Sequence, residues 1–213
     1  MTAETYANRV SSSKIETLNG HFVDPLNMDP ADIRIEDIAH ALAMQCRFSG
    51  YTRHHYSVAE HSVNVARLVA RMLGDAGGSY HPGAELSRRI VRQALLHDAT
   101  EAYLVDLPSP IKRHFPEFRV AEKKLWAAIA KRFDVPEEMH PFVKEVDGRI
   151  CTTEKVVLLS PDTHMTEWRG FVRDFPPYVG DWNIVDVGNP EFPVPHSVIR
   201  KRFLDFYETV REA

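Results

Sequence analysis

Apolar residues recur every three to four positions over most of the chain, which is the period of an amphipathic α-helix. The first such stripe includes Ile35, Ile38, Leu42 and Cys46. The same period, with start and stop signals, predicts further helices over about 57–73, 84–104, 118–133, 137–159 and 197–211. The helix from Ser57 begins with a capping box, Ser-Val-Ala-Glu, and the helix to residue 104 ends before the run Leu-Pro-Ser-Pro at 107–110.

Only one segment favours a sheet. Asn19 and Gly20 lie between β-compatible flanks over residues 17–23, and Asn-Gly is typical of a two-residue hairpin turn. Five or six helices with at most one small N-terminal hairpin predict an all-α fold. The chain has 213 residues, of which 44% are hydrophobic. That length suffices for one domain with its own core and no disulfide staples.

The charge and composition of the chain argue against several classes of protein. A net charge of −4 argues against binding a nucleic-acid polymer, because such proteins are usually basic. No apolar run approaches the roughly 18 residues that span a bilayer, and the N-terminus lacks the apolar region of a secretory signal. Cys46 and Cys151 are expected to be small core residues in a reducing compartment, which predicts a cytoplasmic protein without membrane contact.

Histidine is the unusual residue, with 11 copies. His61 lies on the apolar stripe of its helix, and the next helix carries His97 and Glu101 on one face with Asp98 beside them. Burying these groups unpaired would cost much free energy, and a divalent cation would satisfy them together. The competing interpretation is that each histidine is a hydrogen-bonded core residue.

The remaining histidines show no such pattern. His54 and His55 precede the Ser57 cap, and the sequence leaves open whether they join the site. Six more lie in expected loops or beside prolines, where exposure is the default: His21, His81, His114, His140, His164 and His196.

A family resemblance favours the metal site. His61, the pair His97-Asp98 and the later Asp147 resemble the H…HD…D signature of HD-domain metal-dependent phosphohydrolases. The run 97–112 is similar to the HD-x-x-E-x(4)-D-L-P-x-P-x-K stretch of YfbR-like 5′-deoxynucleotidases and of related phage dATP triphosphohydrolases. The resemblance covers about residues 33–160. It implies a single HD domain over 1–213, in which 161–213 form a loop and a helix packed on the core.

The resemblance also implies roles for individual residues. Four would bind one divalent metal ion: His61, His97, Asp98 and Asp147. Two imidazoles and two carboxylates suit Mn, Co, Fe or Zn better than Mg. Glu101 would orient or deprotonate the attacking water, and Asp106 would lie near the leaving oxygen or the sugar. Four residues would contact substrate: Arg47, Lys112 and Lys144 at phosphate oxygens, and Phe48 at the sugar or base. Family members carry Trp at the position of Phe48.

The expected activity is cleavage of the 5′ phosphoester of (deoxy)nucleotides by a metal-activated water. The sequence leaves open whether the substrate is a monophosphate or a triphosphate. The alternatives are a non-catalytic HD module that binds a nucleotide as a regulator, and a helical scaffold whose His-Asp cluster is structural. The resemblance further suggests a homo-oligomer.

Overall fold

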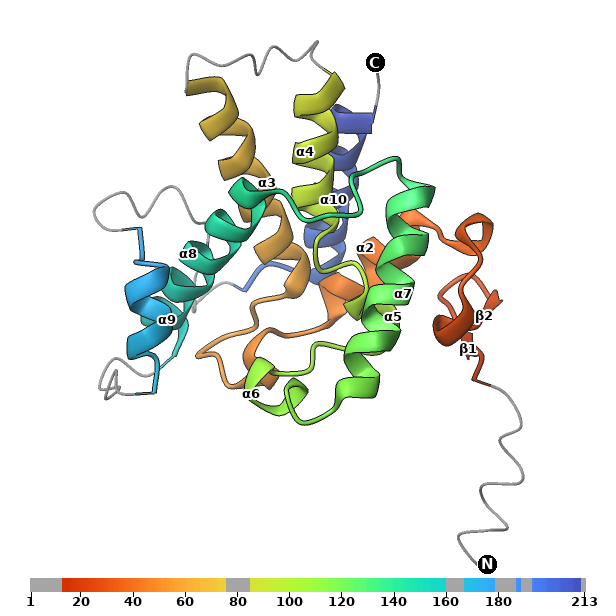
Figure 1. Ribbon diagram of the computed structural model, residues 1–213, viewed down its shortest axis with the longest axis horizontal. Helices are drawn as coiled ribbons and strands as arrows, with labels where there is room; N and C mark the ends of the chain where they lie inside the picture. Colours follow the sequence, from red (N-terminus) through yellow and green to blue (C-terminus); the bar gives the residue numbers. More distant parts are fainter. Residues whose placement is uncertain (1–12, 76–84, 160–166, 179–186, 189–192, 212–213) are drawn as a thin grey trace, which may run out of the picture.

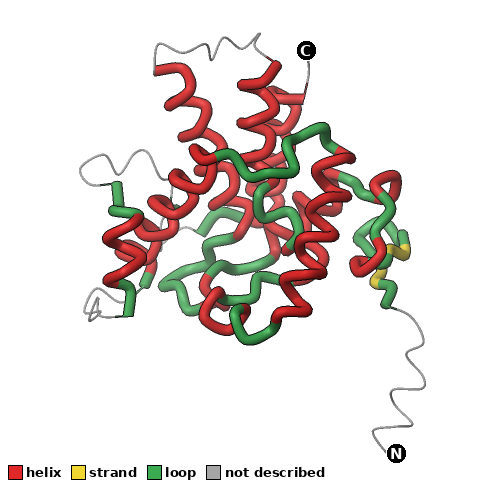
Figure 2. Tube along the Cα trace, in the orientation of Figure 1, coloured by secondary structure: helices red, strands yellow, loops and turns green. Residues whose placement is uncertain are grey.

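The computed structural model describes residues 13–75, 85–159, 167–178, 187–188 and 193–211. Within these ranges the regular secondary structure is almost entirely helical, with loops between the helices and one two-stranded sheet at the edge (Figures 1 and 2). The strands are β1 (Ile15–Glu16) and β2 (Phe22–Val23). The helices are α2 (Ile35–Met44), α3 (Val58–Asp75), α4 (Glu85–Leu96), α5 (Glu101–Leu104), α6 (Ser109–Lys112), α7 (Pro116–Arg132), α8 (Pro141–Leu158), α9 (Arg169–Asp174) and α10 (His196–Arg211). The expected all-α fold with a small N-terminal hairpin is confirmed.

Helix α3 lies at the centre of the bundle and packs against α2, α4, α8 and α10 (Figure 1). The predicted capping box starts it, since the Glu60 N–H donates to Ser57 Oγ (3.2 Å) and the Ser57 N–H donates to Glu60 Oε2 (2.8 Å). The buried core is drawn from all these helices and includes Leu42, Val65, Val69, Leu95, Ile150, Ile199 and Phe203. Helix α10 therefore covers the core, which is why its predicted apolar stripe exists.

The hairpin forms, but its turn differs from the prediction. The register pairs Ile15 with Val23, and the Gly20 N–H donates to the Thr17 carbonyl (3.0 Å). The loop therefore has three residues, 18–20, instead of two. Gly20 has a φ of 75°, the left-handed conformation that such a loop requires at its last position.

The helix expected over 84–104 is interrupted, and that prediction was wrong. α4 ends at Leu96, a tight turn follows in which the Ala99 N–H donates to the Leu96 carbonyl (2.8 Å), and α5 begins at Glu101. Hydrophobic periodicity continued through the break, so it gave no sign of it. The short helices α6 and α9 were also not predicted, because each is too short to display a period.

Among the described residues we find no helix with the length and hydropathy needed to span a bilayer. Cys46 and Cys151 are free thiols, as expected, but both are half-buried instead of lying fully in the core. His81 and His164 lie outside the described residues.

Candidate metal centre and active site

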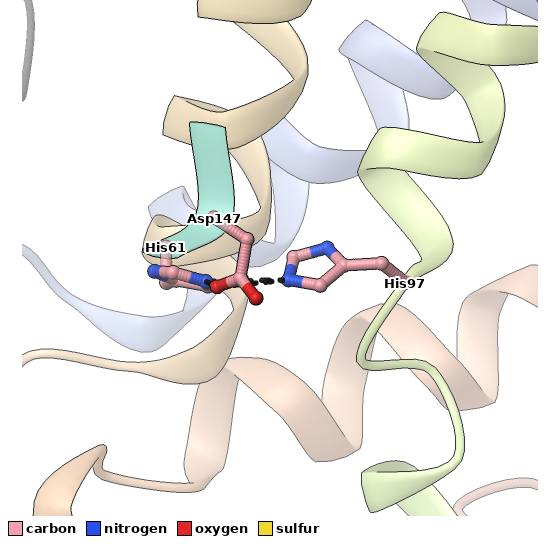
Figure 3. Close-up of side chains that lie close together, drawn as sticks. All are labelled: His61, His97 and Asp147. Carbon is pink, nitrogen blue, oxygen red and sulfur yellow. Dashed lines mark hydrogen bonds and ion pairs between the residues drawn. The ribbon is translucent and has the colours of Figure 1, made fainter. Parts of the chain in front are cut away.

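Three side chains from three separate elements converge on one point (Figure 3). His61 comes from α3, His97 from the turn after α4, and Asp147 from α8. His61 Nε2 lies 3.1 Å from Asp147 Oδ1 and 3.3 Å from His97 Nε2. The three ligand atoms lie within 4.8 Å of one another, a spacing at which one ion can contact them all.

Asp98 joins this cluster. Its Oδ2 lies 3.3 Å from His97 Nε2 and 3.8 Å from His61 Nε2. Neighbouring residues on a regular helix point about 100° apart, so His97 and Asp98 would diverge there. Because α4 ends at Leu96, both side chains can reach the same point.

The histidine tautomers fit a metal ion. His97 Nδ1 lies 2.8 Å from the Ala94 carbonyl, which can only accept a hydrogen bond. His61 Nδ1 lies 2.8 Å from Glu154 Oε1, a carboxylate oxygen. Nδ1 is therefore a donor in each ring, and when both rings are neutral the two Nε2 lone pairs face each other at 3.3 Å. A cation between them removes this unfavourable contact, and carboxylate or carbonyl partners on Nδ1 are usual for metal-bound histidines.

The charges point to the same conclusion. Asp98, Asp147 and Glu154 supply three carboxylates and Arg47 one guanidinium, which leaves an excess of two negative charges. Burial works against a charge on His97, yet Asp98 and Asp147 raise the pKa of its imidazole well above the usual value. The cluster therefore attracts positive charge, and one divalent cation would balance it.

Glu154, which the sequence analysis did not single out, organises the cluster. Its side chain is fully buried and accepts hydrogen bonds from Tyr56 Oη (2.7 Å), His61 Nδ1 (2.8 Å) and Arg47 Nε (3.1 Å). It lies seven residues after Asp147, two turns along the same face of α8. A carboxylate at this spacing on an otherwise apolar helix face was the signal that could have found it.

Arg47 lies at the edge of the cluster, with Nη1 3.3 Å from Asp98 Oδ2. Its backbone N–H donates to the Tyr56 carbonyl (2.8 Å), which fixes the segment before α3. The Phe48 ring lies beside Arg47, with 5.5 Å between the guanidinium carbon and the ring centre. Phe48 and Ser49 both have a φ of 53°, a conformation that costs free energy for residues other than glycine. Such strain is often found where a side chain must be held in a functional position.

Glu101 is buried, and its Oε2 has no hydrogen-bond partner among the described residues. Burial and the carboxylates of Asp98 and Asp106 raise its pKa well above the usual value. Gln45 fixes the backbone at Glu101 and at Asp106, the two ends of the segment that carries α5. Its Nε2 donates to the Glu101 carbonyl (2.9 Å), and its Oε1 accepts from the Asp106 N–H (3.1 Å). Glu101 is thus a carboxyl group held in place but left unpaired beside the cluster.

Neither of the two predicted phosphate-binding lysines, Lys112 and Lys144, forms an ion pair with the metal cluster in the described residues. Lys112 Nζ pairs with Glu122 Oε1 at 2.7 Å, although its charge is close enough to lower the pKa of Glu101. Lys144 is exposed, and its side chain forms no hydrogen bond or ion pair with the metal-binding residues in the described part of the chain. His54, whose role was open, bonds the Val187 carbonyl through Nε2 (2.7 Å) and is not among the ligands.

A row of aromatic rings extends from Phe48 to α9. The Trp168 ring centre lies 6.4 Å from that of Phe48 and 5.7 Å from that of Phe171, which in turn lies 5.0 Å from Phe175. Phe175 packs against Gly148, where a Cβ atom would come within 2.4 Å of the ring. The glycine after Asp147 therefore lets this segment sit close to the candidate metal ligand.

Comparison with known proteins places the chain in a family. The family described as 5′-deoxynucleotidase YfbR-like matches residues 40–155. The uncharacterized protein YfdR of Escherichia coli is 38% identical over 145 residues, which are 67% of this chain and 71% of that protein. An uncharacterized protein of Rhodobacter capsulatus is 41% identical over 122 residues, 56% of this chain and 57% of that protein.

Relatives that carry a functional name match a shorter region. A 5′-deoxynucleotidase of Photorhabdus laumondii is 30% identical over 115 residues, which cover 50% of this chain and 56% of that enzyme. The chain thus spans little more than half the length of this relative. The match to residues 40–155 contains every residue of the cluster from Arg47 to Glu154. The chain belongs to the YfbR-like 5′-deoxynucleotidase family.

Proposed function

We propose that this protein is a metal-dependent nucleotide phosphohydrolase that cleaves the bond between the 5′ oxygen and phosphorus of a (deoxy)nucleotide. The observation that carries the proposal is the unpaired carboxyl group of Glu101 beside two imidazole Nε2 atoms and two carboxylates that converge for one cation. Family membership and the names of relatives support it. A bound divalent ion would supply Lewis acidity and lower the pKa of a water molecule.

The residues of the chain divide the remaining work. Glu101 accepts a proton from the attacking water, because its oxygen has no competing partner. The positive charge of a bound ion would lower its pKa and favour the ionised form. Arg47 uses Nη1 and Nε for Asp98 and Glu154, so its other guanidinium nitrogen remains for a phosphate oxygen. Asp106 would return a proton to the 5′ oxygen of the leaving nucleoside, since burial raises the pKa of its carboxyl group.

The metal preference follows from the donor atoms. His61, His97, Asp98 and Asp147 combine two nitrogens with two oxygens, which suits Mn, Co, Fe or Zn better than Mg. Hydrolysis of a monophosphate and of a triphosphate would break the same bond. The names of the relatives that are 5′-deoxynucleotidases favour the monophosphate.

A screen of phosphate release tests the proposal. Metal-free protein is incubated with nucleoside mono-, di- and triphosphates and one divalent metal at a time. We expect inorganic phosphate from deoxynucleoside monophosphates, and a loss of about 10²–10⁴-fold in kcat for E101Q with metal content unchanged. Tripolyphosphate from triphosphates would instead assign the triphosphohydrolase activity. Nucleotide binding without any hydrolysis would favour the regulatory module.

The neighbouring rings of Phe48 and Trp168 are the proposed contact for the base of the nucleotide. The Lys155 Nζ lies 5.9 Å from the Trp168 ring centre, which adds a cation near its face. Base stacking on an aromatic ring contributes about 1–3 kcal/mol, so W168A should raise KM roughly five- to 150-fold with little change in kcat. F171A, one ring further from Phe48, is the matched control. An unchanged KM in W168A would remove Trp168 from the substrate site.

A further inference from the structure

A cavity lies between the hairpin, α2 and α5, away from α8 and α9 (Figure 1). Its volume is about 520 Å³. Its polar lining consists of Glu16, Thr17, Asp37, His40 and Tyr103, and it contains none of the residues of the metal cluster. Four small or aliphatic residues complete the wall: Ile15, Leu18, Ala41 and Ala102.

Buried polar atoms without partners are concentrated here. In the described part of the chain, eight buried side-chain nitrogen or oxygen atoms have no hydrogen-bond partner. Three of them belong to residues lining this one cavity: Thr17 Oγ1, His40 Nδ1 and Tyr103 Oη. The Tyr103 side chain is only 9% exposed. Unsatisfied buried groups are rare in native proteins, and a group of them indicates a missing partner.

The burial of Asp37 without an ion-pair partner in the described residues is the second sign of a missing ligand. Its side chain is 5% exposed, and its hydrogen bond within the described residues is a long one, from Asn19 Nδ2 at 3.4 Å. No lysine, arginine or histidine in that part of the structure forms an ion pair with it. Asp37 lies in the first turn of α2, where the helix dipole favours a negative charge. That effect offsets only part of the cost of burying an uncompensated carboxylate.

The charges of the residues that line the cavity indicate which class of ligand it can bind. Two carboxylates and no lysine or arginine line the cavity, which excludes a phosphate or another anion. A bare metal ion is also disfavoured, because the only group of converging metal-ligand atoms in the described residues is that of His61, His97 and Asp147. A cation with an organic body would satisfy Asp37 and the hydroxyl groups and would contact the aliphatic wall.

We propose that this cavity binds a small organic cation, an ammonium or guanidinium group on a short aliphatic chain, with its charge at Asp37. The hydroxyl oxygens of Thr17 and Tyr103 accept hydrogen bonds from the same group, and Glu16 attracts a second charge at the other end of a diamine. The inference is independent of the proposed enzyme activity, because it concerns binding at residues outside the metal cluster.

Isothermal titration calorimetry on the metal-loaded chain of 213 residues tests this, with putrescine and agmatine as probes and 1,4-butanediol as the uncharged analogue. We expect saturable binding of the two cations at one site per chain, and none of the diol. D37N should weaken binding at least tenfold. E36Q, an exposed neighbour with the same change of charge, is the matched control and should bind as the wild type does.

A second variant covers the case in which D37N does not fold. A41L leaves every charge in place but fills the cavity, and it should abolish binding of both probes. Equal binding by the wild type, D37N and A41L would overturn the proposal, since the cations would then be attracted only by the net negative charge. Failure of the wild type to bind either cation would overturn it as well.

Discussion

Two buried polar regions of this protein differ in how completely their groups are paired. At the metal cluster, Tyr56 donates to Glu154 (2.7 Å), and Glu154 also holds His61 and Arg47. In the cavity beside the hairpin, the hydroxyl of Tyr103 lies near the backbone of Arg34 but forms no hydrogen bond of good geometry with the described residues. Asp37 has only the amide of Asn19 at 3.4 Å.

The difference separates a site that is organised in advance from one that depends on its ligand. Around His61 the protein itself supplies hydrogen bonds that orient both histidines and Asp98, so the ion completes a site that is largely arranged without it. Around Asp37 the partners are missing from the protein. The exception in the first region is Glu101, whose free carboxyl oxygen marks it as the reactive group and not as part of the support.

Replacing one of the candidate metal ligands should have the largest effect on metal content and activity. D147N takes away one negative charge at the cluster, and we expect the bound metal to be lost and nucleotide hydrolysis to fall by about a thousandfold or more. Metal per chain is measured by mass spectrometry and helicity by circular dichroism. The control is D205N, an exposed aspartate on α10 that pairs with Lys201. Full activity of D147N would contradict the assignment.

Substitution of Glu154 should lower the metal affinity of the same cluster by less than the loss of a metal ligand does. E154Q keeps the size of the side chain but weakens the hydrogen bond that orients His61, so metal affinity should fall roughly 10- to 100-fold. E145Q, an exposed glutamate on the same helix, should leave the dissociation constant unchanged. An E154Q variant with wild-type metal affinity would mean that Glu154 only fills space.

The same variant should alter the stability of the metal-free protein at low pH. Burial acts to raise the pKa of Glu154, but His61 and Arg47 outweigh it and hold the pKa below its usual value near 4.5. The unfolded chain therefore binds this proton more readily, so stability is lost as pH falls from about 5 through the folded-state pKa. Urea unfolding of E154Q between about pH 5 and pH 3 should show a shallower loss than the wild type.

The two tyrosines give the smallest and most direct comparison. Y56F removes a buried hydrogen bond to a charged group and should lower the free energy of unfolding by about 1.5–3 kcal/mol. Y103F removes a hydroxyl without a partner and should change it by less than about 0.5 kcal/mol. Urea denaturation of both variants without added ligand measures this. Equal losses would show that Tyr103 is paired after all, and the contrast between the two regions would disappear.

Much of the fold followed from periodicity and capping. The stripe beginning at Ile35 and the capping box at Ser57 predicted α2 and α3 nearly to their ends, because burial of one face and satisfaction of end groups are local requirements. The break after Leu96 was not predicted. A helix can stop without a proline or glycine when a side chain is needed elsewhere, as Asp98 is here.

For the candidate site, the sequence by itself indicated the chemistry, since helix faces placed His61, His97 and Asp98 near one another as candidates for one divalent ion. Asp147 was added by the resemblance to the HD-domain signature. Only the tertiary structure decided which other residues support them. Glu154, Gln45 and Trp168 act through contacts with residues far away in sequence, across 93 positions for Glu154 and His61. No local pattern encodes such a contact, because it depends on how helices pack. The Asp37 cavity is the clearest case, since its unpaired groups are recognised only once the neighbouring elements are in place.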